Sequence, residues 1–194
     1  MKKLEGLKLG VALCGSFCTF ASAVKMIQNL VDLGVDVHPI MTDHAYEITT
    51  RFGKSEDFIA QIEEITGKEI LHTIPSVEPL GPKGVIDAIL IAPCTGNTLA
   101  KLANGITDTA VPLAAKALLR NAKPVIIAIS TNDGLGLSLK NIGEVIHNQS
   151  IFFVPFGQDD PINKPYSLIA DLALVPETIE MAINYKQIQP ILIK

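Results

Sequence analysis

The chain has 194 residues, of which 48% are hydrophobic and 19% charged, and its formal net charge is −4. This composition is typical of a chain with a large buried core, and we expect one domain over residues 1–194. The acidic balance and the lack of basic runs exclude an extended nucleic-acid surface. The apolar stretches are too short to span a bilayer, and the start, Met1-Lys2-Lys3, lacks the apolar segment of a signal peptide. We therefore expect a cytoplasmic protein without nucleic-acid or membrane partners.

The chain contains three cysteines, Cys14, Cys18 and Cys94, and no two of them form a C-x-x-C pair. A disulfide framework or a zinc site needs more ligands at closer spacing. We therefore expect reduced thiols and no metal site.

Short apolar runs alternate with helical patterns from the start of the sequence. Residues 7–13 predict a strand, and apolar positions at i, i+4, i+7 and i+8 from Ala23 predict a helix that Gly34 terminates. Residues 35–41 predict a second strand. The next segment predicts a short helix that is capped at residues 42–44 and runs through Phe52. A further helix is predicted over residues 55–66, with an N-cap at Ser55 and a stop at Gly67. Residues 68–84 predict a short strand plus a loop.

The second half of the chain continues this alternation. Apolar runs predict buried strands over residues 85–92, where Asp87 is the exception, and over residues 124–130 and 151–155. Helices are predicted over residues 95–103, 109–120, 139–146 and 176–185. Strands separated by helices imply right-handed crossovers. We therefore predict an α/β fold with a single doubly wound, mostly parallel sheet flanked by helices, which binds ligands at the carboxyl ends of its strands.

The first predicted strand ends in Cys14-Gly15-Ser16-Phe17-Cys18-Thr19, directly before a helix. Gly15 lets a ligand approach the backbone, and Ser16 and Thr19 supply hydroxyls at a helix N-terminus, which together favour phosphate. The loop is neither G-x-G-x-x-G nor a Walker motif, so it does not indicate a dinucleotide or a nucleoside triphosphate. Helix capping by Ser16 or Thr19 is the alternative use of the same hydroxyls.

Three further strand ends carry small polar residues. Thr42 follows the second strand, where it can reach a ribityl or ribose hydroxyl, although an N-cap role explains it as well. The loop at residues 93–98 offers more hydroxyl and amide groups than simple capping requires. The loop at residues 130–134 is again polar and again at a strand end, although Asp133-Gly134 alone indicates a turn. Beyond Gly15, Ser16 and Thr19, the cofactor-binding residues predicted at this sheet edge are Thr42, Cys94, Thr95, Asn97, Thr98 and Ser130.

The string Pro93-Cys94-Thr95-Gly96-Asn97-Thr98 resembles the Pro-Ala-Ser-Ala-Asn-Thr signature of the homo-oligomeric flavin-containing Cys decarboxylase superfamily. The short Gly15-Ser16 loop and the order of the elements are similar to that superfamily too. Residues 91–108 and 154–161 resemble one branch of it, whose members serve dipicolinate formation in sporulating bacteria. The likeness runs over nearly the full chain.

The resemblance implies a Rossmann-like flavoprotein fold that binds FMN, with the phosphate held by Gly15 and Ser16. It implies a homo-oligomer, a trimer or a multiple of trimers, with flavin at the subunit contacts. It also implies work in the mother-cell cytoplasm with a separate A subunit similar to nicotinamide-dependent dehydrogenases, so that NAD(P) enters only through that partner. The implied reaction is a two-electron oxidation that aromatises a cyclic dicarboxylate of the dihydrodipicolinate type.

Two elements of the decarboxylases in this superfamily are missing. Their catalytic His is replaced by Ser76 in the nearest string, and their Trp-containing substrate clamp has no counterpart because the chain contains no Trp. Decarboxylation of a peptidyl or pantothenoyl cysteine is therefore not expected. Two alternatives stay open beside the synthase role: a non-redox subunit that binds substrate or phosphate, and a flavin-dependent decarboxylase or prenyl-transferring relative.

The sequence offers no complete set of catalytic residues. His72 and Cys94 are the weak candidates: His72 lies near the substituted motif and Cys94 beside a helix start, and neither has a visible catalytic partner. A dicarboxylate substrate needs cationic partners. Arg51, Lys54 and Arg120 are candidates for that role, and the sequence does not select among them.

Overall fold

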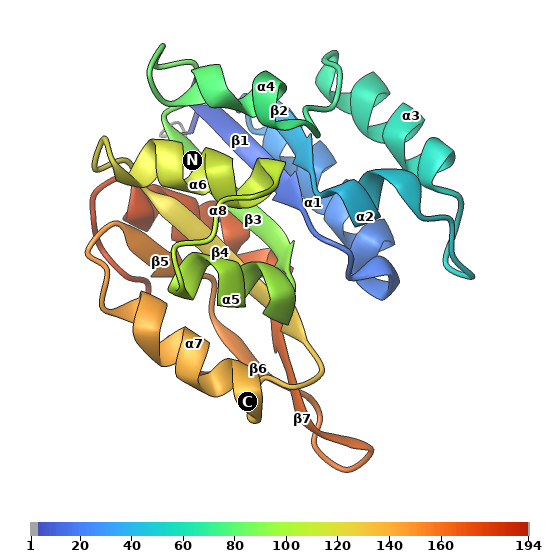
Figure 1. The fold of residues 1–194 in the computed structure, drawn as a ribbon, viewed down its shortest axis with the longest axis vertical. Coiled ribbons are helices and arrows are strands. Elements are labelled where there is room, and N and C mark those ends of the chain that lie inside the picture. The colour runs from blue at the N-terminus through green and yellow to red at the C-terminus, as the bar shows by residue number, and fades with distance from the viewer. Residues whose placement is uncertain (1–3, 194) are drawn as a thin grey trace.

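A computed structural model describes residues 4–193; Lys194 and the start Met1-Lys2-Lys3, on which the signal-peptide expectation depends, lie outside them. A twisted sheet runs through the described part with helices on both faces (Figure 1). Its strands are β1 (Lys8–Leu13), β2 (Asp36–Met41), β3 (Ala88–Cys94), β4 (Val125–Thr131), β5 (Ile151–Phe153), β6 (Phe156–Asp160) and β7 (Lys164–Ala170).

The strand order within residues 4–193 is β2-β1-β3-β4-β7-β6, and β5 pairs with β4 beside this path. Strands β1 to β5 are parallel to one another where they pair, whereas β7 runs antiparallel both to β4 and to β6, with which it forms a hairpin. One edge of β4 is shared, because β5 pairs with its first half and β7 with Ser130 and Thr131 at its end. This topology confirms the predicted doubly wound, mostly parallel sheet.

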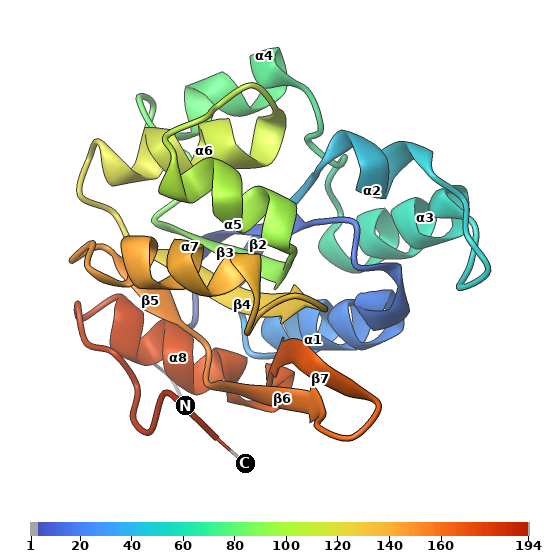
Figure 2. The same ribbon diagram turned by 60° about the horizontal axis from the view of Figure 1, so that its bottom comes forward.

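Helices connect the strands and cover both faces of the sheet. The helices after β3 and β4 lie on one face, and the helices after β1 and β7 lie on the other (Figure 2). No helix within residues 4–193 is long and apolar enough to cross a bilayer. The helices are α1 (Phe20–Asp32), α2 (Asp43–Glu47), α3 (Ser55–Thr66), α4 (Ile74–Val77), α5 (Gly96–Ala103), α6 (Ala110–Leu119), α7 (Leu137–Ile146) and α8 (Val175–Ala182).

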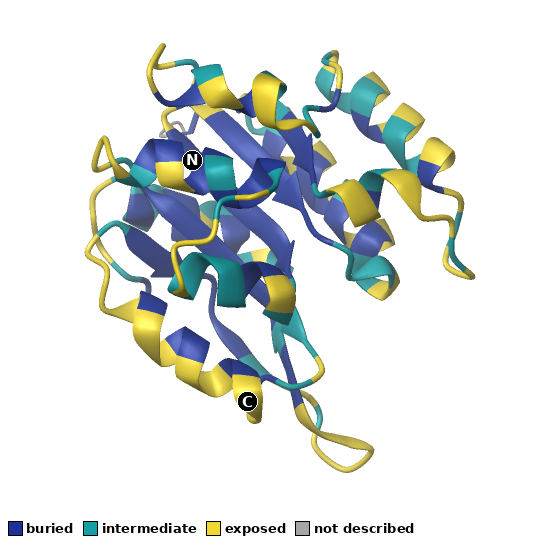
Figure 3. Ribbon diagram, viewed as in Figure 1, coloured by how far each residue is buried: buried dark blue, intermediate teal, exposed yellow. Residues whose placement is uncertain are grey.

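The centre of the core is β3, whose seven residues are all buried (Figure 3). The strand extends past the predicted end at residue 92, so Pro93 and Cys94 belong to it and not to the loop that follows. Pairing explains the difference: Cys94 lies opposite Ile129 of β4, and the Cys14 N–H donates to the Pro93 carbonyl at 3.1 Å. The loop after β3 therefore begins only at Thr95.

Two predicted helix boundaries in the first half are wrong. The short helix after β2 ends at Glu47 instead of Phe52, because Ile48 has an extended backbone. Lys54, not Ser55, is the N-cap of α3, while the predicted stop at Gly67 is confirmed by its left-handed φ of 65°.

Residues 68–84 form helical turns where a short strand plus a loop was predicted. A capping box starts α4: the Thr73 hydroxyl accepts from the Ser76 N–H, and the Ser76 hydroxyl accepts from the Thr73 N–H. The only strand-like pairing described in this segment is an isolated bridge between Leu71 and Ile40. Two reciprocal hydrogen bonds therefore fix a helix start that a proline-rich sequence conceals.

The hairpin of β6 and β7 was not predicted. The expected strand over residues 151–155 ends at Phe153, and the chain then turns into β6. Asp160 stabilises the turn by accepting from the backbone N–H groups of Ile162 and Asn163 at 3.2 and 3.0 Å. The hairpin covers the end of β4 and thereby forms one wall of the site described below.

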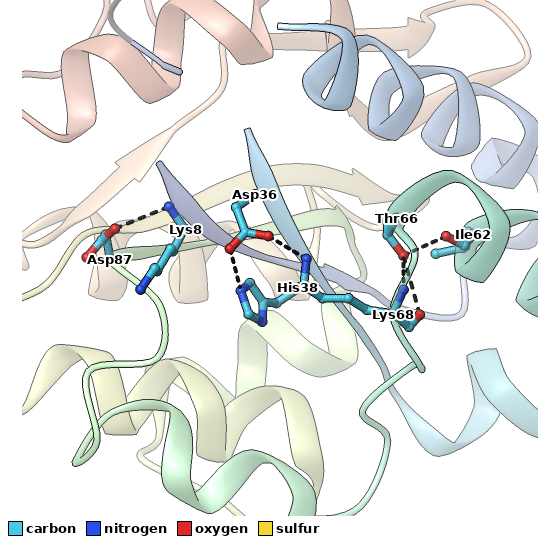
Figure 4. A network of polar contacts seen from close by, with 7 residues as sticks. All are labelled: Lys8, Asp36, His38, Ile62, Thr66, Lys68 and Asp87. Atoms are coloured by element: carbon cyan, nitrogen blue, oxygen red, sulfur yellow. Dashed lines mark hydrogen bonds and ion pairs between the residues drawn. The ribbon is translucent and has the colours of Figure 1, made fainter. Parts of the chain in front are cut away.

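A network of ionic contacts lies at the amino ends of β1 and β2, opposite the carboxyl ends of the parallel strands (Figure 4). The Lys68 ammonium pairs with the Asp36 carboxylate, and this contact lowers the pKa of Asp36. The His38 ring lies 3.3 Å from the other Asp36 oxygen, yet burial lowers the pKa of His38. These contacts stabilise the starts of the strands, at the end of the sheet away from the carboxyl ends where ligands bind.

Candidate functional site

A crevice opens where the chain leaves neighbouring strands toward opposite faces of the sheet. After β1 the chain enters α1 on one face, and after β3 it enters α5 on the other face (Figure 2). Ligands of doubly wound sheets bind at this kind of switch point. A cavity of about 1340 Å³ lies there, and its walls include the predicted residues Gly15, Ser16, Thr19, Thr95, Asn97 and Ser130.

The hydroxyl of Ser16 points across the end of the sheet. Ser16 precedes the 3₁₀ turn Phe17–Thr19 but makes no side-chain cap, and its Oγ lies 2.8 Å from Oγ of Ser130 on β4. Because β3 lies between β1 and β4, this bond spans the end of β3. The Thr19 hydroxyl instead donates to the Ser16 carbonyl at 2.7 Å. The Ser16 hydroxyl can therefore exchange its bond to Ser130 for a bond to a ligand, whereas the Thr19 hydroxyl is used within the loop.

The start of α5 forms the next wall of the cavity. Thr95 is the N-cap of this helix, yet its side chain makes no capping bond, and Asn97 is exposed in the first turn. Thr98 points away, since only 2% of it is exposed and it does not line the cavity. The first turn therefore presents Thr95, Asn97 and backbone N–H groups to a ligand.

A carboxylate is fastened directly beside this helix start. Oδ1 of Asp133 accepts from the hydroxyls of Thr131 and Ser138 at 2.6 and 2.7 Å, and these bonds lower the pKa of Asp133. A Cβ on Gly96 would lie 2.7 Å from Ser138 Oγ and 3.0 Å from Asp133 Oδ1. Glycine at position 96 therefore lets α5 approach this cluster. Asp133 was not among the predicted site residues, because Asp133-Gly134 by itself indicates a turn.

Cys94 is buried and does not line the cavity. It is 1% exposed, and the contact with Cys14 together with burial raises its pKa well above the ordinary value. A protonated, buried thiol is a poor nucleophile. This environment fits a small residue packed under the ligand loop better than a catalytic one.

Thr42 and His72 also lie outside the residues that line the cavity. Oγ1 of Thr42 accepts from the Ala45 N–H at 3.3 Å, which is the N-cap bond of α2. The His72 ring stacks on Tyr46 with 3.7 Å between the ring centroids and 9° between the planes. Both side chains thus have structural partners, and neither is brought together with the Ser16–Ser130 pair.

Three cationic side chains within residues 4–193 line the cavity, and only one of them was among the three candidates named from the sequence. Arg51 is in the wall, but Lys54 and Arg120 are not. Lys140 of α7 and Lys164 of β7 are there instead, and Lys164 pairs with Asp159 at 2.7 Å. No sequence signal marked Lys140, since a lysine on an amphipathic helix is ordinary.

Comparisons with known proteins show the family to which the chain belongs. The family model described as Flavoprotein matches residues 1–172. The chain is 45% identical over 194 residues to the B subunit of dipicolinate synthase of Bacillus subtilis (strain 168), a match that covers 100% of this chain and 97% of that protein. The resemblance drawn from residues 91–108 and 154–161 is thereby confirmed.

Solved structures share the fold over almost the whole chain. The crystal structure of the B subunit of dipicolinate synthase from Bacillus halodurans C has a TM-score of 0.90 and 44% identity, covering 98% of each chain. The FMN-dependent cysteine decarboxylase SpaF has a TM-score of 0.70 at 21% identity, covering 93% of this chain and 97% of its own, which is a likeness of fold. From the match over residues 1–172 and the full-length relative, the chain belongs to the Flavoprotein family.

Proposed function

We propose that this chain is the B subunit of a dipicolinate synthase and that it binds FMN in the crevice between β1 and β3. The observation that carries the proposal is the Ser16–Ser130 pair at the wall of a cavity of about 1340 Å³, in a chain 45% identical over its length to a protein of that name. The cavity exceeds the usual range for small-molecule sites, roughly 300–1,000 Å³, so it has room for both a cofactor and a substrate.

The donors in the cavity fit the parts of FMN. The phosphate would lie at Gly15 and Ser16, at the start of the helical turn Phe17–Thr19, where the Ser16 hydroxyl makes no capping bond. Thr95, Asn97 and Ser130 would face the ribityl chain and the ring. Bound there, FMN would supply a two-electron acceptor in a site whose other groups orient the substrate.

The proposed reaction removes a hydride and a proton from a dihydrodipicolinate-type dicarboxylate and leaves the aromatic ring of dipicolinate. The partner is a dehydrogenase-like A subunit, through which NAD(P) enters, in the cytoplasm of a sporulating mother cell. The chain's own contribution is to bind and orient the anionic substrate.

We also propose that the chain assembles into a trimer or a multiple of trimers. Support comes from two apolar side chains that line the cavity and are nonetheless exposed: Leu137 is 79% exposed and Phe52 is 48% exposed. Exposed apolar groups of this kind mark contact surfaces when they gather near a site. Light scattering should give the mass of three or more chains, and a monomeric mass would contradict this part.

A decarboxylase activity is disfavoured by the place of Ser76. The resemblance puts this residue where the decarboxylases carry their catalytic His, and its hydroxyl here donates to the Thr73 carbonyl at 2.8 Å within the capping box of α4. Ser76 does not line the cavity. Release of carbon dioxide from a cysteine-ended substrate would overturn this conclusion.

Reconstitution tests the synthase role. The isolated A subunit should fail to form dipicolinate, and addition of this chain with FMN should restore formation. Full activity of the isolated A subunit would refute the role, and restoration by FMN-free chain would point to the non-redox support role. Ser16→Ala provides the matched control, because it should lower the restoration at limiting FMN while leaving the fold intact.

A further inference from the structure

We propose that two cations in the cavity wall bind different anions: Arg51 pairs with the FMN phosphate, and Lys140 pairs with a carboxylate of the substrate. This inference rests on the proposed function and adds the residues that select the dicarboxylate. It starts from the charged groups in the wall, which are Arg51, Asp133, Lys140, Asp159 and Lys164.

Three of these groups already have partners. Lys164 and Asp159 form an ion pair at 2.7 Å, and Asp133 is held by two hydroxyls beside the positive end of α5. Arg51 and Lys140 have no acidic partner within 4.0 Å in the described part of the chain. The Arg51 guanidinium lies over the Phe52 ring, 4.9 Å from its centroid, and within residues 4–193 neither cation is neutralised by a carboxylate. Both can therefore pair with anionic ligands.

Arg51 belongs to the side of the cavity formed by the loop after β1. It lies in the loop between α2 and α3, two residues before Gly53, whose backbone packs on the Phe58 ring. The Phe58 ring contacts Phe20 with centroids 5.2 Å apart, and Phe20 contacts Phe17 at 5.3 Å. This chain of rings connects the Arg51 loop to the Ser16 turn, where the phosphate is placed.

Lys140 belongs to the other side of the cavity. It follows Ser138 in the first turn of α7, and Ser138 is bonded to Asp133 and packs against Gly96 at the start of α5. The neighbouring Asn141 also lines the cavity and is 8% exposed. An ammonium and an amide on one helix turn are suitable donors for a carboxylate.

The two sides meet at the Ser16–Ser130 bond, so a ligand that spans them would have its phosphate near Arg51 and its ring near Lys140. A dianionic substrate that reacts with the ring needs a cation on that side. Lys140 is the one wall cation in residues 4–193 that is both on that side and unpaired. The geometry therefore assigns substrate recognition to α7.

Binding measurements on the full-length chain separate the two roles. FMN affinity is measured by quenching of flavin fluorescence, and affinity of the FMN-loaded chain for pyridine-2,6-dicarboxylate is measured by calorimetry in buffer free of divalent metal. Lys140→Ala should weaken dicarboxylate binding about tenfold or more, as expected for a lost charge-assisted hydrogen bond, and change FMN affinity by less than about twofold. Lys140→Arg should restore most of the dicarboxylate affinity.

Arg51→Ala should show the reverse pattern, with weaker FMN binding and nearly unchanged dicarboxylate binding at saturating FMN. Lys54→Ala and Arg120→Ala are the matched controls, because these cations lie outside the cavity and should change neither affinity. The inference is overturned if Lys140→Ala binds the dicarboxylate like the wild type, if it loses FMN instead, or if the wild type does not bind the dicarboxylate. FMN binding by the wild type in the same experiment reports separately on the proposed function.

Discussion

Replacing Gly96 with alanine places a methyl group where α5 meets the Asp133 cluster. The new Cβ would lie 2.7 Å from Ser138 Oγ, 2.9 Å from Thr131 Oγ1 and 3.0 Å from Asp133 Oδ1. Real Cβ atoms do not tolerate such contacts, so either the helix start or the hydroxyl–carboxylate cluster must shift. Both belong to the wall of the cavity.

The expected cost follows from two opposing effects. Overpacking by one methyl group costs about 1–3 kcal/mol, while alanine in place of glycine in a helix gains up to about 1 kcal/mol. We therefore expect Gly96→Ala to lower the free energy of unfolding by about 1–2 kcal/mol. FMN affinity should fall as well, because Thr95 and Asn97 move with the helix start.

Gly143→Ala is the matched control. Gly143 lies inside α7, no neighbouring atom lies within 4 Å of the position that a Cβ would take there, and its φ is not left-handed. The free energy of unfolding of this variant, measured in urea, should rise by up to about 1 kcal/mol, and its FMN affinity should stay unchanged. The packing effect is refuted if Gly96→Ala is as stable as Gly143→Ala and binds FMN like the wild type.

Three further substitutions test the roles assigned to Ser16, Thr42 and Asp133. Ser16→Ala should weaken FMN binding about tenfold by flavin-fluorescence titration, because the phosphate loses a hydroxyl donor; an unchanged affinity would place the phosphate elsewhere. Thr42→Ala should lower stability by about 0.5–2 kcal/mol through the lost N-cap of α2 and leave FMN affinity unchanged; weaker FMN binding would show that Thr42 reaches the cofactor. Asp133→Ala should be less stable than the wild type at neutral pH by about 1–3 kcal/mol, since two hydroxyls lose their acceptor. Folding lowers the pKa of Asp133, so the ionised carboxylate stabilises the folded protein at pH values above the ordinary pKa of about 3.9. This stabilisation is lost as the pH falls through the lowered pKa of the folded state. Urea unfolding between neutral and acid pH should therefore show the gap between Asp133→Ala and the wild type narrowing below about pH 4, and a constant gap would contradict the assignment.

Apolar patterning predicted the parallel sheet because its strands are buried on both faces. The residues of β3 are apolar on both faces of the strand, as expected for a strand covered by helices on both sides. Because strands alternate with helices along the chain, few topologies are possible. The loops after β1 and β3 were found for the same reason, since they follow strands whose positions were clear. Gly15, Ser16, Thr95 and Asn97 were predicted at the cavity wall from their places at these strand ends.

The parts that were missed depend on contacts between distant segments. The β6–β7 hairpin mixes charged residues with a proline, and its place is fixed by pairing with the end of β4. Asp133 became part of the wall because Thr131, Ser138 and Gly96 surround it in space. Lys140 stands out only once the other wall cations are seen to be paired or distant.

FMN titration of the purified full-length chain tests the central claim most directly. The crevice between β1 and β3 should quench flavin fluorescence and shift the visible absorption band, with saturation at one FMN per chain. Ser16→Ala should bind more weakly in the same titration. If the wild-type chain leaves both the fluorescence and the visible band of FMN unchanged, the cavity does not hold flavin and the proposed cofactor site is wrong.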